Sequence, residues 1–523
     1  MAKFYQYIII VFDFGGVMSF EKNKFQVVKK KRLPKSEFNV ECNIPLENEI
    51  GKIFSVCHSA QVESAEVLNG AVNYSGCIEI CILYQTIDGE ISTINSSCPF
   101  SSKFEDSVIT VTDKVGIKCE VENYSVDSVT SSNVKINCTV EQSGVIISCH
   151  DVETIMPLDD DICTKKEEIY VSTFIGEASE IFSMESEISI KEPIRKVILC
   201  ESQVSVKDVE SGINFVSVSG EVINRILYLT ENDRYETSFV TENFKEEVEL
   251  EGVSQNSITE AKAAVKHSQV KCDVVEQERG VSIKINVPVE IKVCAFEEKQ
   301  VDVIKDIYSQ KEELEVSTSS FDMTKTLQSD YFETKIDGNL TLDDDKPRID
   351  KVLFVAGTEL SLSNAYIQNG EIFVEGVAKA NVVYLNDEEN SNNSVVVEVP
   401  FVVSDKTTAP CENPDISVSA ILYDVDVVAR KGRELFFDGK LKVRVNYDCE
   451  EVSAVISSVE AKGDVVERDC SVELVYAKSG TDAWDIAKKF RVSEEMVQIQ
   501  NPEISFPLQE DASVILYFQK VKN

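Results

Sequence analysis

The sequence predicts a mainly β protein, in which three tandem antiparallel β-sandwich-like repeats precede a small C-terminal β-α-α-β domain. Three observations lead to this prediction. Apolar and polar residues alternate over long stretches, one strand-like spacing occurs three times, and helical spacing is confined to the C-terminal end.

The recurring unit is a Gly followed eight residues later by a Tyr, and by a Phe sixteen or seventeen residues after that. The three instances are Gly76–Tyr84–Phe100, Gly220–Tyr228–Phe244 and Gly376–Tyr384–Phe401. A Gly inside a strand marks a bulge or a close backbone approach, and a Tyr eight residues later lies on the same face. We therefore interpret these residues as a structural signature with the Tyr ring in the core; ligand binding is the alternative.

Domain boundaries follow from this unit and from a second echo, KEEIYVST at 166–173 and KEELEVST at 311–318. We predict an N-terminal segment at 1–36, repeats at 37–160, 165–308 and 311–460, and the last domain at 470–520. Residues 282–293 alternate as a half-buried antiparallel strand does. Hairpin turns are predicted at Asp88-Gly89, Asn369-Gly370 and Asp438-Gly439.

The composition limits the possible partners. Acidic residues outnumber basic ones 91 to 52 in 523 residues, which gives a net charge of −39. Such a surface repels phosphate, so we expect no nucleic-acid partner. The length predicts three or four domains, and the apolar fraction is sufficient for real cores.

The chain has fifteen cysteines and no CxxC pair. We interpret most of them as small buried apolar residues in a reducing compartment. Cys77 and Cys81 share a strand face and could suit a metal, although a core pair explains them as well. The doublets Cys57-His58 and Cys149-His150 leave a pooled zinc site as an alternative. The prediction is no metal and no cofactor, since EF-hand spacing is also missing around Asp344-Asp345.

The first residues offer neither a membrane span nor a clear leader, because the apolar run at 8–11 is too short. Either Met1 or Met18 could be the true start.

Residues 8–18, IIIVFDFGGVM, resemble the first motif of haloacid-dehalogenase-type hydrolases, which implies Asp13 as a nucleophile. The α/β pattern of that family does not follow, and there is no P-loop, G-x-S-x-G or dinucleotide motif. We therefore predict no catalytic residues and no enzyme.

The C-terminal pattern predicts a strand at 472–476, helices at 481–490 and 493–500, and a closing strand at 514–518. Ser493 is a natural N-cap, and Trp484 is expected in the core. This unit resembles a LysM domain through Tyr476, Gly480, Trp484, Phe490 and Asn501-Pro502. LysM domains bind N-acetylglucosamine glycans between two loops, but the usual Gly-Asp-Thr is Gly480-Thr481-Asp482 here, and Pro-Gly-Gln is Pro507-Leu508-Gln509.

Three β repeats before such a domain resemble the clostridial sporulation proteins that combine SPOCS repeats with a C-terminal LysM domain. The resemblance implies a partner, the spore morphogenetic ATPase called stage IV sporulation protein A, and a location at the forespore surface in the mother-cell cytoplasm. It makes a scaffold the first hypothesis and a peptidoglycan-binding protein the alternative. The candidate binding residues of the LysM-like domain are Gly480, Thr481, Asp482, Asp485, Lys488, Arg491, Asn501, Pro502 and Leu508. A face that docks a partner protein is expected on the exposed helix residues Asp485, Lys488, Lys489, Arg491 and Glu495 rather than on the sugar loops.

Overall fold

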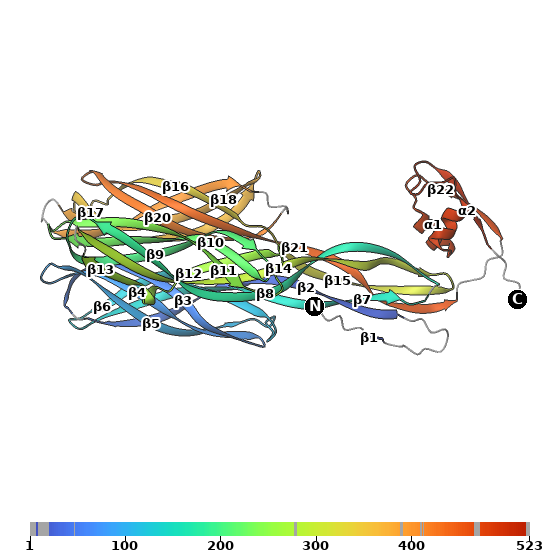
Figure 1. Ribbon diagram of the computed structural model, residues 1–523, viewed down its shortest axis with the longest axis horizontal. Coiled ribbons are helices and arrows are strands. Elements are labelled where there is room, and N and C mark those ends of the chain that lie inside the picture. The colour runs from blue at the N-terminus through green and yellow to red at the C-terminus, as the bar shows by residue number, and fades with distance from the viewer. Residues whose placement is uncertain are drawn as a thin grey trace.

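The computed structural model describes residues 7–8, 20–46, 48–159, 161–276, 280–386, 391–407, 411, 413–464 and 471–518. Three β-sandwiches form an elongated head, from which paired strands continue as a stalk (Figure 1). The C-terminal module, with both α-helices of the described residues, lies at the end of the stalk. The predicted mainly β fold class is confirmed.

The first sandwich shows the plan of all three. A long strand enters the head, a three-stranded meander forms one sheet, and a further strand and a long returning strand complete the other sheet. The strands are β2 (Phe20–Pro45), β3 (Ile50–Leu68), β4 (Ala71–Thr86), β5 (Ile91–Glu105), β6 (Lys114–Val129) and β7 (Asn133–Pro157), and the short β1 (Tyr7–Ile8) pairs with β2. The sheet orders are β1-β2-β7-β6 and β3-β4-β5, and their alternating apolar residues fill the space between them.

The second and third sandwiches repeat this order. The second consists of β8 (Ile162–Ile190), β9 (Ile194–Ser211), β10 (Phe215–Thr230), β11 (Tyr235–Glu249), β12 (Ile258–Val265), the 3-10 turn η1 (His267–Gln269), β13 (Lys271–Glu276) and β14 (Val281–Ser309). The third consists of β15 (Glu312–Thr326), β16 (Asp330–Thr341), β17 (Ile349–Gln368), β18 (Glu371–Asn386), β19 (Asn392–Lys406), β20 (Asp415–Lys431) and β21 (Glu434–Asp464). In the third, β15 and β16 together take the place of the single entering strand.

The recurrent glycines lie opposite the recurrent phenylalanines. Gly76, Gly220 and Gly376 pair directly with the Phe of their own repeat on the neighbouring strand. On its other side each Gly meets a β-bulge, and a Cβ atom there would come within 3.0 Å of a backbone carbonyl and of the Phe ring. The partner tyrosines, Tyr84, Tyr228 and Tyr384, are buried in the three sandwich cores. The recurring Gly–Tyr–Phe spacing in the sequence therefore arises from one bulged strand pairing that forms in each of the three sandwiches.

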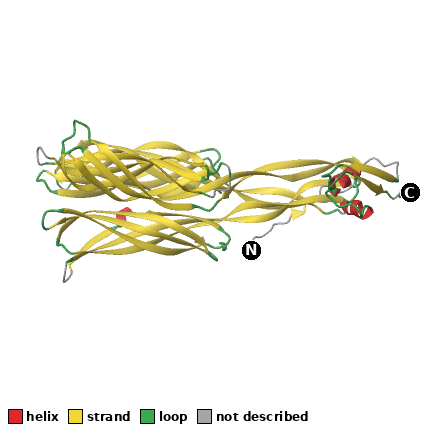
Figure 2. Ribbon diagram, turned by 90° about the horizontal axis from the view of Figure 1, so that it is seen from above, coloured by secondary structure: helices red, strands yellow, loops and turns green. Residues whose placement is uncertain are grey.

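The stalk (Figure 2) consists of the outer parts of three antiparallel strand pairs, β2/β7, β8/β14 and β15/β21. An isolated pair of strands is at best marginally stable in water. Here each pair contributes to a shared core, in which Val27 and Val152, Val171 and Val303, and Met323 and Val455 are buried together. A second shared cluster of isoleucines lies nearer the tip.

Strand β2 begins at Phe20, well before the expected repeat start at residue 37. The stretch 29–32, KKKR, which the sequence assigned to the N-terminal segment, joins the repeats where the stalk meets the head. Lys29 pairs with Asp322, Lys31 with Asp106, and Arg32 with Asp415. The buried Lys30 ammonium lies 2.8 Å from Asp448 and 3.1 Å from Glu260. Four adjacent cations therefore contact all three repeats.

One turn prediction was wrong. Turns do occur at Asp88-Gly89 and Asn369-Gly370, but Asp438-Gly439 lies inside β21. Asp438 pairs with Asp337 on one side and Asp426 on the other, so neighbouring strands on both edges hold it extended. The actual turn before β21 is at Gly432, which has a positive φ of 52°.

Candidate functional site

The C-terminal module has the predicted β-α-α-β order: β22 (Val472–Ala477), α1 (Ala483–Phe490), α2 (Glu494–Gln500) and β23 (Ala512–Tyr517). The Ser493 hydroxyl accepts a hydrogen bond from the Met496 amide at 3.2 Å and caps α2. Trp484 is buried against the inner face of the β22–β23 sheet, together with Ile486, Val497 and Leu516. These contacts fix both helices on one face of a two-stranded sheet.

The module is attached to the end of the β8/β14 strand pair. The Tyr308 ring packs edge-on against Trp484 with 4.9 Å between centroids, and the Tyr308 hydroxyl donates to the Val492 carbonyl at 2.6 Å. The Trp484 indole N–H donates to Asp306 at 2.8 Å, and the Lys488 ammonium lies 2.6 Å from the other oxygen of the same carboxylate.

Two further polar contacts extend this interface. The Lys165 ammonium lies 2.9 Å from Asp482, and the Arg491 guanidinium donates to the Ser309 carbonyl at 3.3 Å. Asp482, Lys488 and Arg491, which the sequence offered as candidate binding residues, thus contact the protein's own stalk.

The carboxylates of this interface have perturbed acidities. Burial raises the pKa of Asp306, but the Lys488 ammonium and the Trp484 N–H together outweigh it, so the pKa is lowered. The hydrogen bond from Lys165 lowers the pKa of Asp482. Both groups are therefore held as carboxylates while the module is attached.

Of the other predicted binding residues, some lie in two loops, Asn501 is buried, and the rest are exposed. The Gly480 amide donates to the Leu508 carbonyl at 2.7 Å, and the Leu508 amide donates to the Thr481 carbonyl at 3.0 Å. The two loops that the LysM resemblance assigns to glycan are thus bonded to each other. Asn501 is buried and bonds to the backbone of Val497 and Ile515, whereas Asp485, Lys489, Glu495 and Pro502 are exposed.

Sequence reasoning missed Lys165, Asp306 and Tyr308, because each lies more than 170 residues before the module residue that it contacts. A signal was present, however. Only the second of the three long returning strands ends on an acid followed by an aromatic, Asp306-Ile-Tyr308, whereas the others end on ETIMP (153–157) and EAKGD (460–464).

The histidine doublets lie in separate environments. His58 is 3.3 Å from Glu359 of the third repeat, and Cys57 is within 3.7 Å of Glu201 of the second. Cys149 and His150 instead pair with Val28 and Val27 of β2. No group of three potential metal ligands is found in the part of the chain that the structure describes. Asp13, which the resemblance to hydrolases would make a nucleophile, lies outside the described residues, as do Met1 and Met18.

Most of the described cysteines are unpaired thiols, and burial raises the pKa of Cys81 to about 12 and that of Cys294 to about 11. Such thiols are unreactive at neutral pH. Cys411 and Cys449 are an exception to the expected unpaired state, because a disulfide joins them. Cys411 precedes β20 and Cys449 lies in β21, so the bond ties the loop between the two sheets of the third sandwich to its longest strand.

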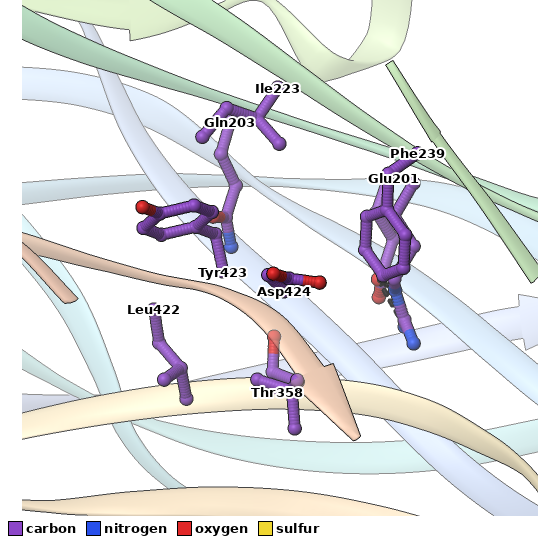
Figure 3. A pocket seen from close by; sticks show the side chains of 10 residues that line it. Glu201, Gln203, Ile223, Phe239, Thr358, Leu422, Tyr423 and Asp424 are labelled. Atoms are coloured by element: carbon purple, nitrogen blue, oxygen red, sulfur yellow. Dashed lines mark hydrogen bonds and ion pairs between the residues drawn. The ribbon is translucent and has the colours of Figure 1, made fainter. Parts of the chain in front are cut away.

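A crevice between the second and third repeats is lined by Gln203, Phe239, Thr358, Tyr423 and Asp424 (Figure 3). Its floor is an ion pair, because the buried Arg225 donates to Glu201 and, at 2.7 Å, to the Val355 carbonyl of the third repeat. The pair lies next to an apolar cluster that all three repeats share, with Phe54, Leu199 and Phe354 among its members. The arrangement holds the repeats together and leaves little room for a ligand.

The fold defines a class of protein: a β-repeat protein in which three fused sandwiches carry a small helical module on a common stalk. Residues 49–129 and 193–273 match the family described as "SipL, SPOCS domain". Two separate segments of the chain are thus similar to the same SPOCS domain. Each matched segment contains a three-stranded meander and the strand after it, and the second also includes η1 and the beginning of β13. Both omit the long strands of the stalk. No curated protein and no solved structure matches the chain.

Of the helices in the described ranges, none is long and apolar enough to cross a bilayer.

Proposed function

We propose that this protein is a non-catalytic scaffold in endospore envelope assembly, and that its C-terminal module, a LysM-like domain, docks a spore-coat morphogenesis protein. The observation that carries the proposal is the match of two segments to the SPOCS domain of SipL. The third meander, β17–β19, has the same bulged Gly–Phe pairing as the two matched segments, which supports a third repeat of the same kind.

The shape of the molecule supports a scaffold. The largest buried clusters fill sandwiches, the stalk and the junctions between repeats, and the polar side chains between repeats are engaged in structural bonds. The crevice between the second and third repeats is floored by a satisfied ion pair rather than by free catalytic groups.

The proposed partner is a protein like stage IV sporulation protein A, which the resemblance to SPOCS–LysM proteins implies. The proposed location, in the mother-cell cytoplasm at the forespore surface, has the same basis. Peptidoglycan is the second candidate ligand, favoured by the β-α-α-β order of the module. Against it, the two sugar-binding loops of the LysM resemblance are hydrogen-bonded to each other.

The test is a binding comparison with the full chain. Purified protein is mixed with immobilised stage IV sporulation protein A and, separately, with pelleted peptidoglycan. A chain that ends at residue 464 and lacks the module is the matched control. We expect retention on the ATPase that depends on the module. Sedimentation with peptidoglycan and no retention on the ATPase would contradict the proposal.

A further inference from the structure

The β22–β23 sheet of the C-terminal module has an apolar outer face. Register pairs Val472 with Tyr517, Leu474 with Ile515 and Tyr476 with Ser513, and residues opposite each other in an antiparallel pair point to the same side. The inner side faces the helices. The outer side exposes Val472 (54%), Leu474 (67%), Tyr476 (69%) and Tyr517 (53%). We call these four residues, with Ile515, the outer sheet face.

The fold of the module does not require this face to be apolar. Val475, Ala477, Val514 and Leu516 on the inner side already complete the core with the two helices. An antiparallel sheet with one solvated side normally alternates apolar and polar residues. Here both sides are apolar, and contiguous exposed apolar patches on soluble proteins mark interaction sites.

The stalk leaves the outer sheet face uncovered. The contacts between module and stalk come from α1, its flanking loops and Trp484, through Asp306, Tyr308 and Lys165. Of the helix residues that the sequence suggested for a partner, Lys488 and Arg491 are therefore engaged with the stalk, while the opposite side of the sheet is open.

The charge of the module selects the chemistry of a partner. Residues 471–518 contain eight acidic and four basic side chains. Two of the four cations, Lys488 and Arg491, are engaged with the stalk. Acidic groups border the outer sheet face, since the Asp511 carboxylate accepts a hydrogen bond from the Tyr476 hydroxyl at 3.1 Å and Glu510 next to it is exposed. A partner surface with basic residues around an apolar centre is complementary to this arrangement.

The size of the face indicates a segment rather than a second copy. Four half-exposed side chains supply roughly half of the ~800 Å² that one partner buries in a standard interface. A second copy of this chain would also bring a charge of −39 and the same acidic border, which like-charge repulsion disfavours.

We propose that the outer sheet face binds a short partner segment that presents apolar side chains flanked by lysine or arginine. This inference deepens the proposed docking function and rests on it only for the identity of the partner.

The experiment measures binding of two probes to the full-length protein by fluorescence anisotropy. The first is a labelled synthetic peptide that alternates Leu or Val with Lys, with peptides in which Glu replaces Lys, or Ser replaces Leu and Val, as composition controls. The second is labelled stage IV sporulation protein A. The test variant is Leu474→Gln/Tyr476→Gln. The matched control is Val452→Gln, at a stalk position that is 77% exposed.

We expect the basic apolar peptide to bind in preference to both control peptides. The double variant should raise its Kd at least tenfold, Val452→Gln should change it less than twofold, and Tyr476→Phe should retain binding. Because the substituted side chains are exposed, circular dichroism and Trp484 emission should not change. The same loss with the ATPase probe would place the proposed partner on this face.

Three results would overturn the inference: no preference for the basic apolar peptide, equal binding by the double variant, or a dimer in sedimentation velocity that only the double variant abolishes. If the peptide binds wild-type protein and the ATPase does not, the proposed partner is refuted. The peptide result then still tests whether the outer sheet face binds a basic apolar segment.

Discussion

Replacing Gly220 by Ala tests the bulged Gly–Phe pairing that defines the repeats. An added Cβ would lie within 3.0 Å of the Ser205 carbonyl oxygen on one side and of the Phe244 ring on the other. Neither neighbour is the free end of a flexible chain, so strands β9 and β10 must separate or the ring must leave the core.

The magnitude follows from these two contacts. Overpacking a filled site costs about 1–3 kcal/mol, and losing one ladder hydrogen bond costs about 1 kcal/mol. Replacing Gly stabilises the protein by roughly 0.4–1 kcal/mol through the unfolded chain. The expected net loss is about 2–3 kcal/mol, and Gly76→Ala and Gly376→Ala should behave alike in their own repeats. Gly116→Ala in β6 is the matched control, because its Cβ would meet nothing within 4 Å.

Hydrogen-exchange mass spectrometry measures the effect in each sandwich separately, which matters because three repeats need not unfold together. A loss of 2–3 kcal/mol accelerates exchange in β9–β11 of Gly220→Ala roughly 30- to 150-fold. In Gly116→Ala, exchange in the first sandwich, which contains β6, should stay at or below the wild-type rate. If the two variants exchange equally, the close approach at the repeated glycine does not govern the stability of the sandwich.

Three further predictions concern the attachment points. Lys30→Met leaves Glu260 and Asp448 without their buried partner and should lower the free energy of unfolding in urea by about 2–4 kcal/mol. In the control Lys35→Met, the exposed Lys35 loses its pair with Glu141, and the loss should be less than about 0.5 kcal/mol. Equal losses would contradict the role of Lys30. Acid should detach the module. Asp306 and Asp482 have lower pKa values in the attached state than the value of about 3.9 of a free Asp, so their ionisation stabilises attachment above about pH 3.9. This stabilisation is lost as the pH falls through the lowered pKa values of the attached state. The sole tryptophan, Trp484, reports detachment directly, so its emission should shift to the red below about pH 4, and Asp306→Asn should shift it already at pH 7; an unchanged spectrum in both cases would refute the attachment. Deleting residues 1–17 should leave the circular dichroism and melting temperature nearly unchanged, whereas deleting 1–36 removes the paired cations of β2 and should prevent folding of the first sandwich; a folded 1–36 deletion would show that β2 before residue 37 is dispensable.

The repeat architecture was accessible from the sequence because its cause is local and occurs three times. The Gly, Tyr and Phe of each meander lie on adjacent strands of one sheet, so their pairing appears as a fixed sequence spacing. The helices of the C-terminal module were accessible for the same reason, since apolar spacing and the Ser493 cap act within a few residues.

Other features depend on contacts between distant segments. The packing of three strand pairs into one stalk joins residues such as Val27, Val171 and Met323, which no sequence spacing relates. The attachment of the module through Asp306 and Tyr308 is of the same kind. Because of it, Lys488 and Arg491, which were expected to dock a partner, contact the stalk instead. Asp438-Gly439 is a sequence typical of a turn, but pairing with β16 on one side and β20 on the other keeps it extended within β21.

The strands of the stalk continue into the head without interruption. β8 runs as one element from Ile162 at the tip into the second sandwich, where Ile175 joins the core. At ~3.3 Å per residue, the part of β8 before that core spans roughly 40 Å. β14 pairs with β8 along this distance, and the register shifts at only two places, Ala295/Phe296 and Ile304/Asp306. The stalk therefore keeps a partner bound at the tip and a partner bound at the head at a set separation.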